Sequence, residues 1–171
     1  MPVAARKRIG DLLRQQAPAI ARDAAGLFLQ QLQLDAQTLA AGVEGAPATT
    51  SLVLPVGGSD EAEAILADSF QRLLGVLALS LLVDEPGLAS EELQWLDRSV
   101  GARFEGVPGA SGPERLIDAL SGACRHFLGS DDSDLLDAWL AQARSGLNET
   151  EPLLTEARTS SHLEGNPPQD K

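Results

Sequence analysis

The stretch SDEAEAILADSFQRLLGVLALSLLV, residues 59–83, decides the fold of this chain. Ser59 is a suitable N-cap residue, and Asp60 and Glu61 directly after it complement the dipole at a helix start. Apolar residues recur at helical spacing in the first half, and nearly every residue from Leu73 onward is apolar. A helix that is apolar on all sides has to be surrounded by other elements. We therefore predict a buried central helix with the remaining helices packed around it.

The same stretch raises the alternative of a membrane helix. A transmembrane helix needs about 20 consecutive apolar residues, and the apolar run that starts at Leu73 is far shorter. A buried helix is therefore the better interpretation. The formal net charge of -12 also disfavours binding to anionic membrane surfaces and to nucleic acid, because both need a basic surface. We expect neither a membrane nor nucleic acid as a partner.

The composition indicates one helical domain in a reducing compartment. Of the 171 residues, 43% are hydrophobic and only 4% are aromatic, so the core is aliphatic, which favours closely packed helices. Cys124 is the only cysteine, and an intrachain disulfide is therefore excluded. The basic residues near the N-terminus are not followed by the apolar segment of a signal peptide. We expect a cytoplasmic location.

Helical periodicity also occurs before residue 59. It predicts a short helix over residues 4–16 and a second helix that begins at Pro18 and ends near Gly42. Residues 42–58 form a long segment rich in glycine and proline, in which Leu52 to Leu54 could form a short extended piece.

Three further helical patterns follow residue 83. They run from Ser90 to Phe104, from a capping box at Ser111 to Leu128, and from Asp131 onward, with Pro152 as a kink or as the start of another segment. No alternating strand pattern is present. The predicted fold is all-α, a single antiparallel bundle or barrel of about six to seven helices over residues 1–163. Residues 164–171 are predicted to be a disordered tail.

Few residues carry chemistry by their type and position alone. His126 is a general acid or base only with an aligned partner. Cys124 falls on an apolar helix face, which indicates an inert core thiol. The sequence Gly57-Gly58-Ser59 precedes a helix start, where backbone N–H groups bind phosphate, although the acidic residues that follow would repel an anion. Residue types and spacing alone therefore indicate only a soluble helical domain.

The C-terminal part carries a more specific pattern. The stretch Gly146-Leu-Asn-Glu-Thr150 is followed by Arg158 and Ser160. This arrangement resembles the nucleotide-binding L subunit of dihydroxyacetone kinases, in which a helix ending in G-x-x-x-T precedes a loop of the form G-R-A-S-Y. The leading glycine and the tyrosine of that loop are replaced in this chain.

Weaker similarities to the same family occur in the same order along most of the chain. LASEEL at residues 88–93 resembles its L-T-x-E-E-L helix start, and DAL at residues 118–120 resembles its D-A-L. Gly57-Gly58-Ser59 resembles its G-G-x-S-G loop. LDA at residues 34–36 resembles the L-D-A that opens its metal motif.

The resemblance implies an antiparallel helical barrel that binds ADP or ATP with two magnesium ions at one end and works with a substrate-binding kinase subunit. It implies one metal ligand, Asp35, and six nucleotide-binding residues: Gly57, Gly58, Ser59, Thr150, Arg158 and Ser160. The family holds its magnesium ions with three aspartates spaced D-x4-D-x-D. Ala40 and Gly42 occupy the other two positions here, with Glu44 as the only nearby carboxylate. We therefore expect weak or absent magnesium–nucleotide binding.

Three hypotheses remain open at this point. The chain is a divergent L-type subunit with a degenerate nucleotide site and a nucleotide-binding or partner-binding role. Alternatively, it is an active subunit that transfers a phosphoryl group to dihydroxyacetone or a similar short-chain ketone. The third hypothesis is a non-catalytic helical interaction or regulatory protein.

Overall fold

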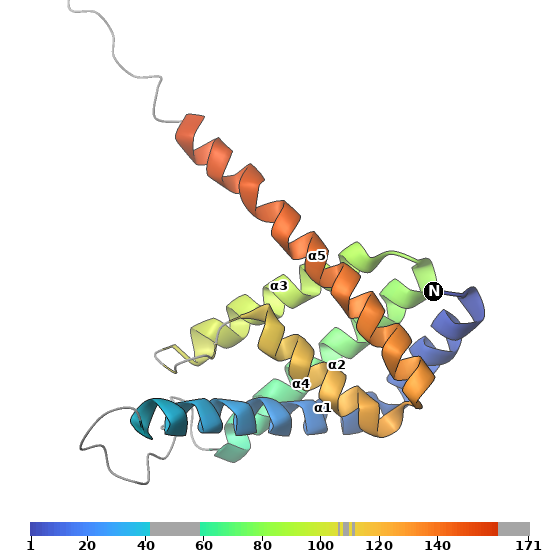
Figure 1. The fold of residues 1–171 in the computed structure, drawn as a ribbon, viewed down its shortest axis with the longest axis horizontal. Helices are drawn as coiled ribbons and strands as arrows, with labels where there is room; N and C mark the ends of the chain where they lie inside the picture. The colour runs from blue at the N-terminus through green and yellow to red at the C-terminus, as the bar shows by residue number, and fades with distance from the viewer. Residues whose placement is uncertain (42–58, 106, 108–109, 111, 161–171) are drawn as a thin grey trace, which may run out of the picture.

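Five α-helices make up the described part of the chain, and no strand occurs in it (Figure 1). The fold is that of a computed structural model, which describes residues 1–41, 59–105, 107, 110 and 112–160, without the side chains of 39–41 and 146–160. The helices are α1 (Val3–Ala41), α2 (Ser59–Val83), α3 (Pro86–Arg103), α4 (Pro113–Phe127) and α5 (Ser130–Ser160). The prediction of an all-α fold is confirmed. The predicted extended piece at 52–54 and the tail at 164–171 lie outside the described residues.

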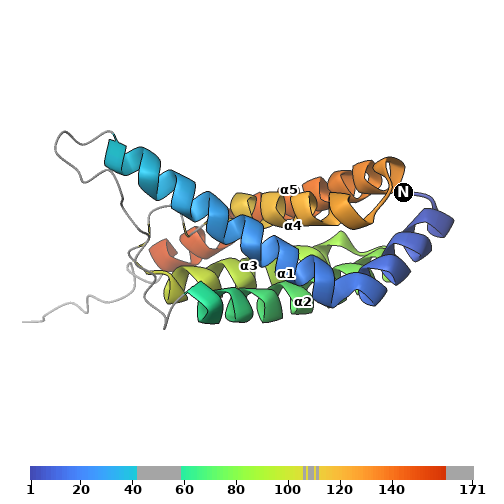
Figure 2. The same cartoon turned by 90° about the horizontal axis from the view of Figure 1, so that it is seen from below.

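Helix α1 is continuous where two helices were predicted. Pro18 lies inside it, although proline removes one backbone hydrogen bond and clashes with the preceding turn. Pro18 is exposed, so water can reach the carbonyl group that loses its donor. Leu13 and Ile20 on either side are fully buried and hold both halves against the core. Figures 1 and 2 show a bend in the N-terminal half of α1, the half that contains this proline.

A second proline also fails to end a helix. Helix α5 runs from Ser130 to Ser160 and therefore passes through Pro152, where a kink or a new segment was predicted. In the ribbon its C-terminal part extends past the other helices (Figure 1). Because both prolines lie within helices, the described residues contain five long helices, and the predicted number of six to seven is not confirmed.

The core is aliphatic and joins all five helices. Helix α2 packs closely along α1: an added Cβ at Gly10 would lie 3.3 Å from the carbonyl oxygen of Ala78. Phe28 of α1 and Phe70 of α2 form an edge-to-face pair with ring centroids 6.5 Å apart. The other helices contribute buried side chains at helical spacing, as predicted: Leu93, Leu96 and Val100 from α3, Leu116, Leu120 and Cys124 from α4, and Leu136, Trp139, Leu140 and Ala143 from α5. Phe127, at the end of α4, is 37% exposed.

Two buried serines connect α5 to the rest of the core. The indole Nε1 of Trp139 donates a hydrogen bond to Ser80 Oγ at 3.1 Å, and that hydroxyl donates to the carbonyl oxygen of Leu77. Ser90 Oγ donates to the carbonyl oxygen of Ala143 at 2.6 Å. Ser90 was predicted to start a helix, but α3 starts one turn earlier, with Pro86 in its first turn. Ser90 therefore connects α3 to α5 by a hydrogen bond and does not cap α3.

Ion pairs and one turn position the ends of the helices. Arg8 Nε of α1 donates to Asp132 Oδ2 of α5 at 2.9 Å, and this guanidinium lowers the pKa of the Asp132 carboxyl group from its ordinary value. Helix α4 begins after Gly112, which has φ +127 and donates its N–H to Asp97 Oδ1 at 2.7 Å. Gly112 is the N-cap residue of α4, and no side chain forms a capping hydrogen bond at this helix start. Ser111, predicted for that role, lies outside the described residues.

Candidate functional site

Asp35, the predicted metal ligand, is paired with an arginine. It lies on α1, six residues before the end of the helix, and its Oδ2 accepts from Arg115 Nη1 of α4. Gln31 Nε2 donates to the other carboxylate oxygen at 3.4 Å. Both partners of the ion pair are partly buried. The carboxylate therefore already has a cation as its partner.

This surrounding does not fit a magnesium ion. Magnesium is held by several oxygen ligands in octahedral geometry, and clustered carboxylates offset its charge. In the described part of the chain, no group of three His, Cys, Asp or Glu side chains is placed to hold a metal. A guanidinium beside Asp35 would also repel a divalent cation. We therefore derive no step through magnesium from this site.

The remaining residues predicted to bind nucleotide are only partly within the described structure. Ser59 is the exposed first residue of α2, at the end of the bundle where α1 also ends. Gly57 and Gly58 lie outside the described residues. Thr150, Arg158 and Ser160 belong to the C-terminal part of α5, whose side chains are not described. Figure 2 shows that α1 and α2 diverge at the end of the bundle where α1 finishes and α2 begins. The assembly of these residues into one site stays a prediction.

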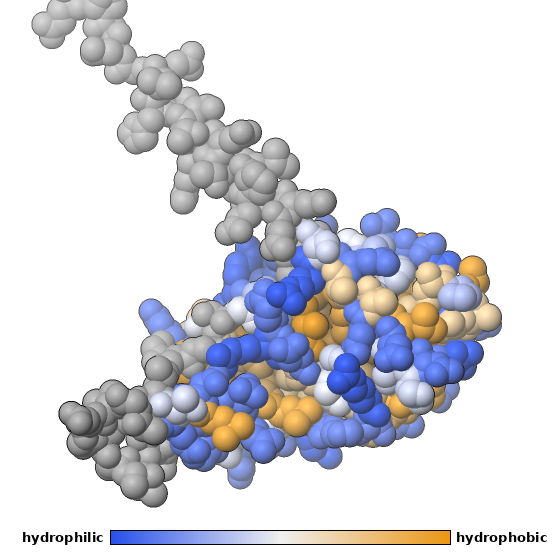
Figure 3. All heavy atoms as spheres, in the orientation of Figure 1, coloured by the Kyte–Doolittle hydropathy of each residue, from blue (hydrophilic) through white to orange (hydrophobic). Residues whose placement is uncertain are grey.

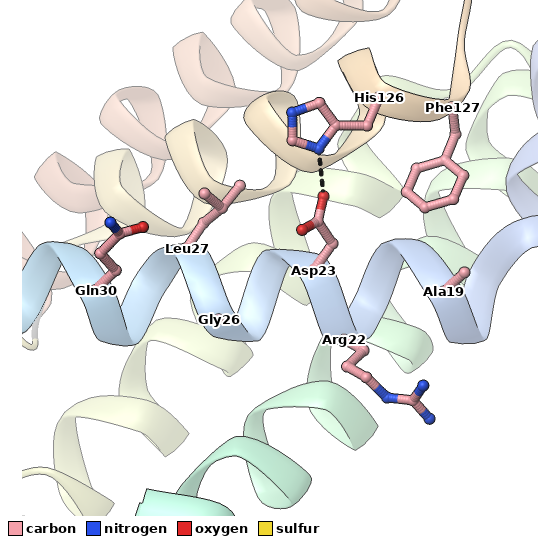
Figure 4. A pocket seen from close by; sticks show the side chains of 8 residues that line it. All are labelled: Ala19, Arg22, Asp23, Gly26, Leu27, Gln30, His126 and Phe127. Atoms are coloured by element: carbon pink, nitrogen blue, oxygen red, sulfur yellow. Dashed lines mark hydrogen bonds and ion pairs between the residues drawn. The ribbon is translucent and has the colours of Figure 1, made fainter.

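A groove between α1 and α4 contains a polar pair of one residue from each helix (Figure 4). His126 Nδ1 lies 2.6 Å from Asp23 Oδ2, between residues 103 positions apart in sequence. The groove has a volume of about 650 Å³ and is lined by Ala19, Arg22, Asp23, Gly26, Leu27, Gln30, His126 and Phe127. In Figure 4 the second ring nitrogen of His126 points away from Asp23, and Arg22 points away from the histidine.

The chemistry available in this groove is limited. Asp23 orients the imidazole as the third member of a catalytic triad would, but none of the side chains that line the groove carries a hydroxyl or thiol nucleophile. A second hollow of about 590 Å³ continues along α1 and α4 towards Arg115. On the face shown in Figure 3, apolar atoms lie scattered in a mainly hydrophilic surface. The pair of Asp23 and His126 therefore acts as a contact between α1 and α4.

Cys124 is a core residue without access to solvent. It is 1% exposed on α4, and burial raises the pKa of its thiol to about 12, with a further contribution from Asp137. A thiol with such a pKa stays protonated at neutral pH and is a poor nucleophile.

The most unusual surface is the C-terminal half of α2. Leu79 is 51% exposed, Leu82 39% and Val83 55%, so this part of the helix is not surrounded by its neighbours. The prediction of a helix buried on all sides is therefore not confirmed. Gly75, one turn earlier on the same side, has open space where a Cβ would lie. We call the surface formed by Gly75, Leu79, Leu82 and Val83 the α2 face.

Charged residues lie at both ends of the α2 face. Arg72, one turn before Gly75, pairs with Glu92 of α3 through Nε at 2.7 Å and stacks on the ring of Trp95, with its Cζ 4.0 Å from the ring centroid. The acidic residues Asp84 and Glu85 follow directly after the helix, and both are exposed. Asp84 adopts φ 62 and pairs with Arg6 of α1. The α2 face is therefore bounded by a positive charge at one end and negative charges at the other.

Among the described residues, α2 is also the one helix long and apolar enough to cross a membrane, judged by length and composition. In the most apolar stretch of 18 residues in α2, 44% is buried within the bundle. Core helices of soluble proteins meet the same criterion, so this finding by itself is weak evidence for a membrane helix.

The fold and these surfaces define an all-helical protein with an exposed apolar helix face. No protein-family model matches the chain, and no significant match occurs among curated proteins or solved structures. The resemblance to the L subunit of dihydroxyacetone kinases therefore rests on the sequence motifs alone.

Proposed function

We propose that this chain is a non-catalytic helical binding protein that associates with a protein partner through the α2 face. The observation that carries this proposal is the exposure of Leu79, Leu82 and Val83 on adjacent turns of one helix. Single exposed hydrophobic residues are common on soluble proteins, whereas contiguous apolar patches mark interaction sites. The formal net charge of -12 makes an anionic membrane an unfavourable partner.

The packing of α2 also supports a binding role over a structural one. Leu77 and Leu81, on the opposite side of the helix, are fully buried and already anchor α2 in the core. The exposed residues Leu79 and Leu82 are therefore not needed to hold the helix in place. Burying an apolar side chain contributes about 1.5–3 kcal/mol, so covering this face by a partner is favourable.

Two alternatives are based on the family resemblance, and the active-kinase hypothesis has the less support of the two. The active-kinase hypothesis needs metal-bound nucleotide phosphates, and Asp35 is engaged by Arg115 in this structure. A nucleotide-free role as partner of a substrate-binding kinase subunit is compatible with our proposal, since that subunit would then occupy the α2 face. The cytoplasmic location and the lack of nucleic-acid binding remain part of the proposal.

Magnesium–ADP is expected to leave the melting temperature unchanged within about 1 °C. A ligand present at 100 times its dissociation constant adds about 2.7 kcal/mol, which would raise the melting temperature of a protein of this size by about 5–10 °C. Thermal unfolding with millimolar magnesium–ADP measures this effect. The double variant Ala40→Asp/Gly42→Asp restores the family's spacing from Asp35 and is expected to gain some magnesium-dependent stabilisation if the register from Asp35 is right. Magnesium-dependent stabilisation of the parent protein would instead favour the active subunit.

Site-specific photo-crosslinking tests the α2 face directly. We expect p-benzoylphenylalanine in place of Leu79 to form one discrete covalent adduct in the native cell, identified by mass spectrometry. The matched control is the same replacement at Leu34, which is a leucine on α1 with 50% exposure, against 51% for Leu79. Adducts that are absent at both positions, or identical at both, would contradict a binding role for this face.

A further inference from the structure

We propose that the partner of the α2 face is a second copy of this chain, bound in an antiparallel arrangement with a two-fold axis at Leu79. This inference rests on the proposed binding role of the α2 face. A two-fold interface uses the same surface on both subunits, so that surface has to be complementary to itself. The α2 face meets this requirement in both its charge and its shape.

The charge pattern reverses along the helix about Leu79. Arg72 lies seven residues before Leu79, which is about two helical turns, and Glu85 follows the end of the helix, two residues after Val83 and beyond the turn at Asp84. In an antiparallel pair centred on Leu79, the end of α2 that carries Arg72 therefore lies beside the end of the other copy's α2 that Glu85 follows. Both ends of the interface would then carry a pair of opposite charges. A parallel arrangement would place like charges opposite each other and is disfavoured.

Arg72 is held in position for such a contact. Its guanidinium group is fixed by Glu92 and by the ring of Trp95 on α3, while its side chain remains 54% exposed. A charged group that is already ordered loses less conformational entropy when it binds. The contact at the other end is equally accessible, because Glu85 is exposed and belongs to no ion pair among the described residues.

The shape of the α2 face is complementary in the same arrangement. Gly75 and Val83 lie four residues before and after Leu79, so each valine would pack over the glycine of the other copy. The space above Gly75 is open, with no atom within 4 Å of an added Cβ. The helices can approach closely there because glycine has no side chain. Leu79 of one copy would meet Leu79 of the other at the axis.

Sedimentation velocity of the full chain at micromolar to submillimolar concentration tests the dimer. We expect a reversible monomer–dimer equilibrium, weakened about a hundred-fold by Leu79→Glu, which would place two carboxylates at the axis. The control Leu34→Glu makes the same change at an equally exposed leucine and is expected to leave the equilibrium unchanged. A strictly monomeric parent protein, or equal effects of the two variants, would overturn the proposal.

Charge reversal tests the antiparallel orientation. Glu85→Arg is expected to weaken dimerisation about ten-fold, because it faces Arg72 of the other copy with a like charge. The double variant Arg72→Glu/Glu85→Arg is expected to recover most of the loss. Circular dichroism verifies that each variant retains its helix content, since Arg72 also contacts α3. Absence of recovery in a folded double variant would contradict the antiparallel pairing.

Disulfide trapping tests the position of the axis without destabilising the core. Leu79→Cys is expected to form a covalent dimer with a mild oxidant, whereas Leu34→Cys is expected to stay monomeric. The native Cys124 does not interfere because it is buried. No trapped dimer at position 79 would overturn the proposed axis.

These results separate the dimer from the more general proposal. A monomer whose position 79 crosslinks to a different protein would remove the dimer and keep the binding role. A monomer that binds neutral phosphatidylcholine vesicles through Leu79, without a protein adduct, would remove both.

Discussion

Replacing Leu77 by aspartate is expected to abolish the cooperative unfolding of this protein or to make it insoluble. Leu77 is 0% exposed in the C-terminal half of α2, the helix that packs against both α1 and α3. The change removes a buried leucine, which costs about 2–5 kcal/mol, and places a carboxyl group in an apolar surrounding at further cost. The sum approaches the total stability of a domain, about 5–15 kcal/mol. Thermal unfolding followed by circular dichroism measures the effect.

The control for this variant is Leu34→Asp, the same chemical change at a half-exposed position of α1. It is expected to melt within a few degrees of the parent protein, because surface substitutions change stability by about 0.5 kcal/mol or less. A Leu77→Asp protein that melts as cooperatively as this control would show that α2 does not hold the core together.

Truncating Phe70 to alanine is expected to destabilise the protein by about 3–5 kcal/mol. Phe70 is 0% exposed and packs edge-to-face on Phe28, with an angle of 67° between the rings. Its loss leaves a cavity between α1 and α2 and removes an aromatic pair worth about 0.5–1.5 kcal/mol beyond its buried area. Urea unfolding gives the change in the free energy of unfolding.

A double-mutant cycle with Phe28→Ala measures the aromatic pair itself. The two single changes are expected to be non-additive, because both remove the same contact. Phe127→Ala is the matched control. This phenylalanine of α4 is 37% exposed, so its truncation is expected to lower the free energy of unfolding much less. Strict additivity of Phe28→Ala and Phe70→Ala would mean that the two rings do not interact in solution.

Much of the secondary structure could be predicted from local patterns. Helix α2 has the predicted bounds, Ser59 to Val83, because acidic residues in its first turn and a turn at its end are local signals. The buried stripes of α3, α4 and α5 follow from helical periodicity. The error at Pro18 has its cause in the tertiary packing. Proline weakens a helix locally, but buried flanking residues such as Leu13 and Ile20 can keep it continuous.

The candidate sites could be predicted less well. The motif match placed Asp35 in a metal site. Only the packing of α4 on α1 shows that this carboxylate forms an ion pair with Arg115, eighty residues away. The contact of Asp23 with His126 was missed for the same reason. Neither pair has a local signal, because the partners belong to different helices.

The sequence by itself determined that this protein is all-helical, with an aliphatic core and a central apolar stretch in α2. Those properties depend on residue type and on spacing along one chain segment, and both can be read directly. Only the tertiary structure decided which sides of α2 are covered. Leu77 and Leu79 are both leucines two positions apart, yet one is fully buried and the other half exposed. That difference arises from where α1 and α3 lie, because the burial of a side chain is set by its neighbours in space.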